Sequence, residues 1–173
     1  HVMPDAVENP KIGLIAADID IPDYAQQLNM QLNDNSGVKD FIDSRNAQLV
    51  EIGERLKETE MNVLFCSREL HPAIIEHLAS NNIYAVRRVR RSDMEALANA
   101  TEARIVMNID TFSPKDLGTS ALLEEVNIGE RPMIKITGTP NKSTVSVLVR
   151  APTHHVVEEI KRAFDDAIGV VSI

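Results

Sequence analysis

Cys66 and His71 are residue types that nucleophilic catalysis uses, and they lie close together in the sequence. Cys66 ends a short apolar run, and the end of a parallel strand is where open α/β sheets place their ligands. A neighbouring histidine can activate a thiol by taking its proton. Free cysteine is also among the most buried residue types, and no third residue to orient His71 is evident. A buried, structural Cys66 is the favoured interpretation, and a catalytic thiol is the alternative.

Histidines and carboxylates occur at two places with spacings that metal sites use. One group opens a predicted helix in two i,i+4 pairs, and the other alternates along a predicted strand. Neither group belongs to an HExxH motif or a cysteine cluster, so ion pairs at the start of a helix and a solvated strand end are favoured over metal binding. The residues are His154, His155, Glu158 and Glu159 in the first group and Asp18 and Asp20 in the second.

The densest basic cluster is the sequence RRVRR at 87–91, which includes Arg87, Arg88, Arg90 and Arg91. Arginines can bind phosphate groups of a nucleic acid. The chain has 26 acidic and 18 basic residues, however, and its net charge of −8 opposes such binding. We therefore expect a strand-to-helix corner whose arginines pair with acidic neighbours.

Val38, Phe41 and Ile42 form an apolar group directly after the polar segment NDNSG at 33–37. A polar stretch then separates them from Leu49, the next large apolar position of the same predicted helix. They either dock on the main core or form an exposed patch that binds another protein. Composition alone does not choose between these two interpretations.

The elements that position these residues follow from the apolar periodicity. Residues 11–21 predict a strand, and alternation over 28–32 predicts a second one. Residues 38–59 predict a long amphipathic helix, with Gly53 as a weak point. Three apolar runs then alternate with two helical stretches, which predicts right-handed crossovers and a parallel sheet. The three runs are 62–66, 83–86 and 103–109.

Turn and cap residues define the remaining elements. Ser92 and Glu95 have the spacing of a capping box, and Ser113 with Asp116 can cap a short turn. Residues 122–138 and 144–150 predict antiparallel strands. Thr153 is predicted to cap a final amphipathic helix. The sequence thus predicts a mixed α/β architecture with a strand-rich second half.

Composition excludes several function classes. Aromatic residues make up only 3% of the 173 residues, which disfavours platforms for stacking bases or sugars. The seven glycines are too dispersed for a GxGxxG or GxxxxGK[ST] loop, so we expect no direct nucleotide binding by this chain. No apolar run reaches the roughly 20 residues of a membrane span, and we expect a cytoplasmic protein with no membrane partner.

Several segments, taken in order along the chain, resemble the group II chaperonins, the family of the archaeal thermosome and the eukaryotic cytosolic chaperonin. The stretch IYAVRRVRRSDMEAL at 83–97 resembles a signature of that family. NVLFCSREL at 62–70, DLGTSALLEEVNIGE at 116–130 and TVSVLVR at 144–150 also match. The chain is nearest in style to an apical-domain fragment of a thermosome subunit.

The resemblance implies an apical-domain-like α/β fold, in which a mixed, strand-rich core is flanked by helices and carries a protruding helical arm that serves as a lid. It implies an N-terminal segment at 1–10, the apical domain at 11–150 with its arm at about 32–51, and a helix at 151–173 leading to the intermediate domain. The residues expected to bind clients, meaning non-native polypeptides, are Val38, Phe41, Ile42, Leu49, Ile75 and Leu78.

The resemblance also implies that ATP and Mg²⁺ bind the full-length subunit and not this fragment, which is then no enzyme alone. Its expected partners are non-native polypeptides and other subunits of a stacked double ring, with no nucleic acid. Two rival functions stay open. One is a small α/β hydrolase or transferase that uses Cys66 and His71, and the other is RNA binding through RRVRR.

Overall fold

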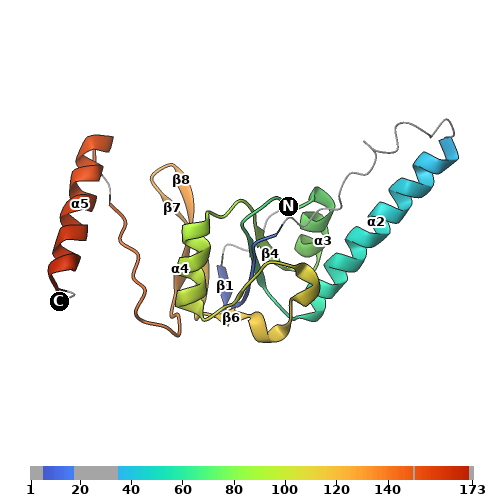
Figure 1. Cartoon of the computed structure of the whole chain (residues 1–173), viewed down its shortest axis with the longest axis horizontal. Coiled ribbons are helices and arrows are strands. Elements are labelled where there is room, and N and C mark those ends of the chain that lie inside the picture. Colours follow the sequence, from blue (N-terminus) through green and yellow to red (C-terminus); the bar gives the residue numbers. More distant parts are fainter. Residues whose placement is uncertain (1–5, 18–34, 150, 172–173) are drawn as a thin grey trace.

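The computed structural model describes residues 6–17, 35–149 and 151–171, and Figure 1 shows their arrangement. The expected strand at 28–32 and the carboxylates Asp18 and Asp20 lie outside these residues. A five-stranded sheet forms the centre of the fold, and four of its strands are parallel in the order β4-β3-β2-β5; these four are called the parallel sheet below. They are β2 (Lys11–Ile15), β3 (Val63–Cys66), β4 (Tyr84–Val86) and β5 (Ile105–Val106).

The crossovers of this sheet are the helices that the periodicity predicts. They are α2 (Asn35–Glu58), α3 (Pro72–Ser80) and α4 (Arg91–Thr101). All three neighbouring strand pairs along β4-β3-β2-β5 are parallel, so the predicted β-α-β-α-β unit is confirmed. Strand β2 is shorter than predicted, because the described chain leaves the sheet after Ile15.

A second, antiparallel sheet has the order β1-β7-β8. The β7–β8 hairpin turns at Gly129, whose φ of 69° is one that glycine adopts without strain. A short β6 pairs antiparallel with β2. These elements are β1 (Ala6–Glu8), β6 (Gly118–Thr119), β7 (Leu122–Ile128) and β8 (Arg131–Thr137), preceded by the 3₁₀ turns η1 (Ile109–Thr111) and η2 (Pro114–Asp116).

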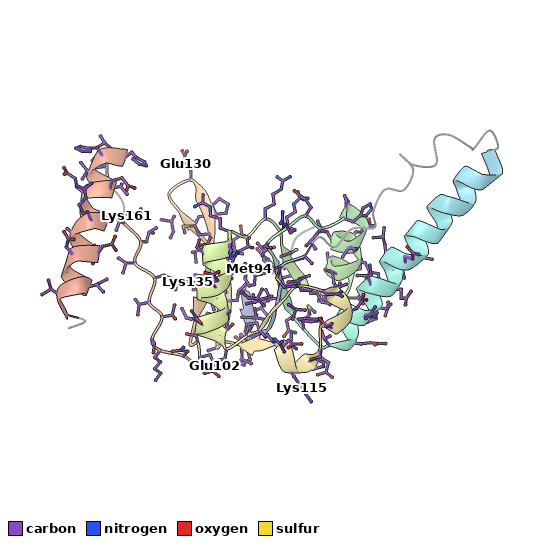
Figure 2. The ribbon with its side chains drawn as sticks, in the orientation of Figure 1. Met94, Glu102, Lys115, Glu130, Lys135 and Lys161 are labelled. Carbon is purple, nitrogen blue, oxygen red and sulfur yellow. The ribbon has the colours of Figure 1, made fainter. Side chains whose placement is uncertain are left out.

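The parallel sheet separates two cores because successive strand residues point to opposite faces. One face packs against α2 and α3, and the other packs against α4 and the β1-β7-β8 sheet. Met94 of α4 lies toward this second core and is 1% exposed (Figure 2). The strand residues on the α4 side are Ile12, Leu14, Val63 and Phe65, and those on the α3 side are Ile15, Leu64 and Cys66.

Two local predictions are wrong. Residues 144–149 form no strand, and Val145 and Val147 are 79% and 60% exposed, because no partner strand in the described chain pairs with them. The capping box at Ser92 is absent, since α4 already begins at Arg91 and Ser92 lies inside its first turn. The cap predicted at Ser113 is confirmed, because Asp116 accepts from both the amide and the hydroxyl of Ser113.

The last helix, α5 (His154–Val171), stands apart from the sheets in Figure 1. Lys161, which is labelled in Figure 2, lies on this helix. Its start is confirmed at Thr153, whose Oγ1 accepts from the amide of Val156 at 3.4 Å. Phe164 and Ile168 of its apolar stripe are 45% and 60% exposed. Among the described residues, no helix has the length and apolarity needed to cross a membrane.

Candidate functional site

Helix α2 holds the residues that the sequence singles out for binding another protein, and its C-terminal half is anchored on α3. Leu49 and Leu56 are 2% and 1% exposed and share a core cluster with Ile74 and Leu78 of α3. Each leucine buried in this way stabilises the fold by about 1.5–3 kcal/mol. The end of α2 is thus fixed to the body.

A close approach of the two helices explains the glycine within α2. A Cβ atom at Gly53 would lie 2.4 Å from Cδ2 and 3.0 Å from Cγ of His77, which projects from α3. The His77 Nε2 lies 3.3 Å from Oε1 of Glu54, an ion-pair distance when the imidazole is protonated. Gly53 therefore permits a close α2–α3 contact, although glycine has a lower helix propensity than alanine.

The N-terminal half of α2 extends away from the sheets, as Figure 1 shows. Val38, Phe41 and Ile42 belong to this half of the helix, and their side chains lie outside what the structure describes. Val50, near the middle of α2 and within the part whose side chains the structure describes, is 51% exposed. The helix therefore changes from an anchored element to a projecting one along its length.

The other three residues expected to bind clients differ in how deeply they are buried. Leu49 and Leu78 are buried, at 2% and 0% exposure, so they act as core residues and are not available to a client in this conformation. Ile75 is half-buried and packs at the edge of the same cluster. The expectation for Leu49 and Leu78 followed from the resemblance, and the apolar pattern of their helices does not reveal what covers each residue.

Cys66 and His71 are both used structurally. Cys66 is fully buried, and its Sγ lies 3.3 Å from the carbonyl oxygen of Ala17 as a donor. The Nδ1 of His71 accepts from the amide of Ala73 at 3.2 Å and caps α3. A thiol without solvent access and a histidine engaged in capping disfavour the hydrolase alternative.

The RRVRR arginines lie at the corner between β4 and α4, and three of the four pair with acidic neighbours as expected. Arg87 and Arg88 both contact the carboxylate of Glu69, with Arg87 Nη1 3.8 Å from Oε2. Arg91 Nε donates to Glu95 Oε1 at 2.9 Å within the first turns of α4. These pairs are exposed, so each contributes at most about 1 kcal/mol.

The histidine pairs at the start of α5 form the expected i,i+4 contacts. His154 Nε2 lies 3.9 Å from Glu158, and His155 Nε2 lies 3.4 Å from Glu159. In the described part of the chain, no three potential metal-ligating side chains gather into one group. The arrangement has the geometry of paired charges on a helix surface.

Two polar contacts shift pKa values. Burial raises the pKa of Tyr84, and the negative charge of Glu125, whose Oε2 accepts from the Tyr84 hydroxyl at 3.2 Å, adds to the increase. This contact joins β4 of the parallel sheet to β7 of the antiparallel sheet. A hydrogen bond from Lys11 Nζ at 2.6 Å, together with its charge, lowers the pKa of the exposed Glu60.

A hollow of about 250 Å³ lies beside the C-terminal end of α2, and no pattern in the sequence indicates it. Arg55, Thr59, Phe112 and Pro114 are among the residues that line it. Arg55 Nη1 also donates to Asp110 Oδ1 at 2.8 Å, which ties α2 to η1. Residues so far apart in sequence meet only because η1 folds back against α2, which no local pattern predicts.

Comparisons with known proteins agree with the resemblance read from the sequence. Residues 1–173 match the TCP-1/cpn60 chaperonin family. The chain is 40% identical over 171 residues to the thermosome subunit alpha of Thermoplasma acidophilum, covering 99% of this chain and 31% of that protein. It is 39% identical over 170 residues to the thermosome subunit of Methanopyrus kandleri, again covering 31% of the relative and 98% of this chain.

A solved structure gives the same result at the level of the fold. The open-state monomer of a group II chaperonin from Methanococcoides burtonii matches with a TM-score of 0.78 and 30% identity, over 98% of this chain and 36% of the other. The chain therefore spans about a third of the length of the proteins that it matches. The sequence and the fold together place the chain in the TCP-1/cpn60 chaperonin family.

Proposed function

We propose that this chain is the client-binding apical domain of a group II chaperonin subunit and that the projecting half of α2 is part of its helical arm. The observation that carries the proposal is the contrast along α2. Its C-terminal half buries Leu49 and Leu56 against the body, whereas its N-terminal half extends away from the sheets. An apolar group on a projecting helix is suited to contact other polypeptides.

The spacing of apolar residues along α2 supports an apolar surface on the arm. Ile42 precedes Leu49 by seven residues, and Leu49 precedes Leu56 by seven, so all three lie on one face of the helix. The face that packs on α3 at one end therefore continues, at Ile42 and neighbouring Val38, into the projecting half. Half-buried Ile75 of α3 lies beside the anchored end and is a second candidate contact for clients.

A single arm would hold clients weakly. Burying Val38, Phe41 or Ile42 on a client contributes up to about 1.5–3 kcal/mol each, before the cost of ordering both partners. Such a patch distinguishes apolar from polar chains but not one apolar sequence from another. Several arms displayed around a ring would raise the avidity by about 10²–10⁴-fold.

The other activities belong to the whole subunit in this proposal. The full-length protein binds and hydrolyses ATP with Mg²⁺, assembles into a stacked double ring and folds polypeptides in the cytoplasm. The present chain supplies capture and part of the lid. The observation that supports this division is its coverage of 31% of the curated relatives, which leaves most of their length for a nucleotide site.

The proposal is tested by protection of a chemically denatured protein against aggregation, followed by light scattering. The informative variant is Val38→Ser/Phe41→Ser/Ile42→Ser on α2. A matched control exists on α5, where Val156→Ser/Phe164→Ser/Ile168→Ser removes the same three residue types from exposed positions. We expect the α2 variant to lose most protection and the α5 variant to retain it, with circular dichroism unchanged in both.

Three results would contradict the proposal. Equal protection by the wild type and the α2 variant would place client capture elsewhere. Loss of protection in the α5 variant alone would assign capture to the C-terminal helix. Because a lone domain lacks avidity, the assay is run with the chain both free and coupled at high density to beads, and absence of protection in both formats would also overturn the proposal.

A further inference from the structure

A positively charged surface lies at the carboxyl edge of the parallel sheet, on loops that the proposed arm does not include. We name it the arginine patch and define it as Arg68, Arg87, Arg88, Arg90 and Arg91. Strands β3 and β4 are adjacent and parallel, so the loops that follow them meet at one edge. The amide of Arg88 donates to the carbonyl of Arg68 at 3.2 Å, which joins the two loops into one surface.

The arginines in this patch outnumber the carboxylates that neutralise them. One carboxylate, Glu69, serves both Arg87 and Arg88. Arg68 and Arg90 are exposed, and their side chains form no ion pair or hydrogen bond with the described part of the chain. A local excess of positive charge therefore persists on a chain whose net charge is −8.

Two backbone features are unfavourable for these arginines in the free domain. Arg88 has a φ of 59°, in the left-handed region that is strained for residues with a Cβ atom. Arg90 is the N-cap residue of α4 and makes no side-chain capping bond, and Arg91 begins the helix. Cations at a helix N-terminus are unfavourable, because the helix dipole already makes that end positive. Both features lower the stability of the free domain. Asp93, in the first turn of α4, offsets part of the second cost, and a bound anionic group would offset more of it.

The chemistry of the patch fits carboxylates better than nucleic acid. Arg88 and Arg91 already bind side-chain carboxylates within the chain, which is the pairing that guanidinium groups form well. The aromatic residues of the adjoining strands, Phe65 and Tyr84, are 3% and 8% exposed, so they offer no surface for stacking bases.

We propose that the arginine patch binds acidic segments of polypeptide clients, beside the apolar surface of the arm. This inference rests on the proposed function, because it specifies which segments of a non-native chain the domain prefers. Apolar capture and carboxylate capture would then act on different parts of one client. A client rich in Asp and Glu near an apolar stretch would be held at two points.

The test measures binding of a fluorescein-labelled peptide of twenty residues, mostly glutamate, to the full 173-residue chain by fluorescence anisotropy. The variant is Arg68→Gln/Arg90→Gln, which removes the two arginines without ion pairs and so breaks no described side-chain contact. The matched control is Lys142→Gln/Arg162→Gln, two exposed basic residues outside the patch that change the net charge equally. Circular dichroism establishes that both variants are folded.

We expect the patch variant to weaken binding roughly fivefold or more and the control to change it by less than about twofold. Binding by the wild type should also fall steeply as salt is raised, because the charges are exposed. A glycine- and serine-rich peptide of the same length, which carries no charge, should not bind. The salt series and the uncharged peptide use only the wild type, so they test the proposal even if a variant fails to fold.

Three results would overturn the inference. They are no binding of the glutamate-rich peptide, equal weakening by both variants, and tighter binding of single-stranded polyuridine than of the peptide through the same arginines. The outcome is separable from that of the proposed function. Retained protection against aggregation with no peptide binding removes only the inference, whereas peptide binding with no protection removes only the proposed function.

Discussion

Helices α2 and α5 carry similar apolar stripes and differ in what covers them. In α2, Leu49 and Leu56 are at most 2% exposed, because α3 and the parallel sheet pack on that face. In α5, Phe164 and Ile168 are 45% and 60% exposed. Periodicity therefore establishes that each segment is helical and which face is apolar. Only the position of the helix relative to the sheet decides whether that face contributes to stability.

The largest expected effect is on the free energy of unfolding, when a covered apolar residue of α2 and an uncovered one of α5 are each replaced by alanine. Leu56→Ala removes a side chain that is 1% exposed and leaves a cavity between α2, α3 and the sheet. We expect it to lower the free energy of unfolding by about 2–5 kcal/mol. Phe164→Ala, its control on α5, should change that free energy by less than about 0.5 kcal/mol.

Urea denaturation followed by circular dichroism at 222 nm measures both variants. The comparison predicts a large shift of the midpoint for Leu56→Ala and almost none for Phe164→Ala. Similar shifts for the two variants would mean that the α5 stripe is covered in solution. The contrast between the helices would then be lost.

The second test uses one glycine in each helix. Gly53→Ala adds a methyl group 2.4 Å from Cδ2 of His77, and this overlap should cost more than the gain of about 1 kcal/mol in helix propensity. The net expectation is a destabilisation of about 1 kcal/mol. Gly169→Ala in α5 has no described atom within 4 Å of the new Cβ, so it should instead stabilise the helix by up to about 1 kcal/mol.

A double variant separates this packing effect from any other. Gly53→Ala/His77→Ala removes the imidazole that the new methyl group meets. It should be more stable than the sum of the two single variants predicts, and the difference is the coupling free energy. Strict additivity in thermal unfolding would show that His77 does not determine how closely α2 approaches α3.

The same reasoning shows how far the sequence alone could lead. The parallel βαβ unit, the long helix and the cap at Ser113 were predictable, because each rests on local periodicity or on a cap within a few residues. The burial of Leu78 and the exposure of Val145 were not, since both depend on which distant segment lies alongside. The start of α4 was predicted wrongly for a local reason, because Arg90 occupies the N-cap position without a side-chain capping bond.

The candidate site divides in the same way. The apolar group at Val38, Phe41 and Ile42 could be found from its position after a polar break, and the RRVRR pairing could be inferred from composition. The union of Arg68 with that cluster required the parallel register of β3 and β4. The Gly53–His77 contact likewise joins residues of two helices, and only the glycine was visible as an irregularity in the sequence.

The smallest expected effect is a pH dependence confined to the body of the fold, where Tyr84 joins the two sheets. Burial and Glu125 raise the pKa of Tyr84, so the folded state holds this proton more tightly than the unfolded state does. Above about pH 10 the unfolded chain loses the proton first, and the free energy of unfolding therefore falls as pH rises through the folded pKa.

Tyr84→Phe removes the hydrogen bond to Glu125, so its free energy of unfolding should be about 1 kcal/mol lower at neutral pH. That free energy should fall less steeply between pH 9 and 11 in the variant than in the wild type. Because α5 contains no tyrosine, this difference in slope, measured by urea denaturation of both proteins at each pH, reports on the covered part of the molecule. Parallel slopes would show that the Tyr84 hydroxyl is solvated and that the two sheets are less tightly joined than the β4–β7 contact indicates.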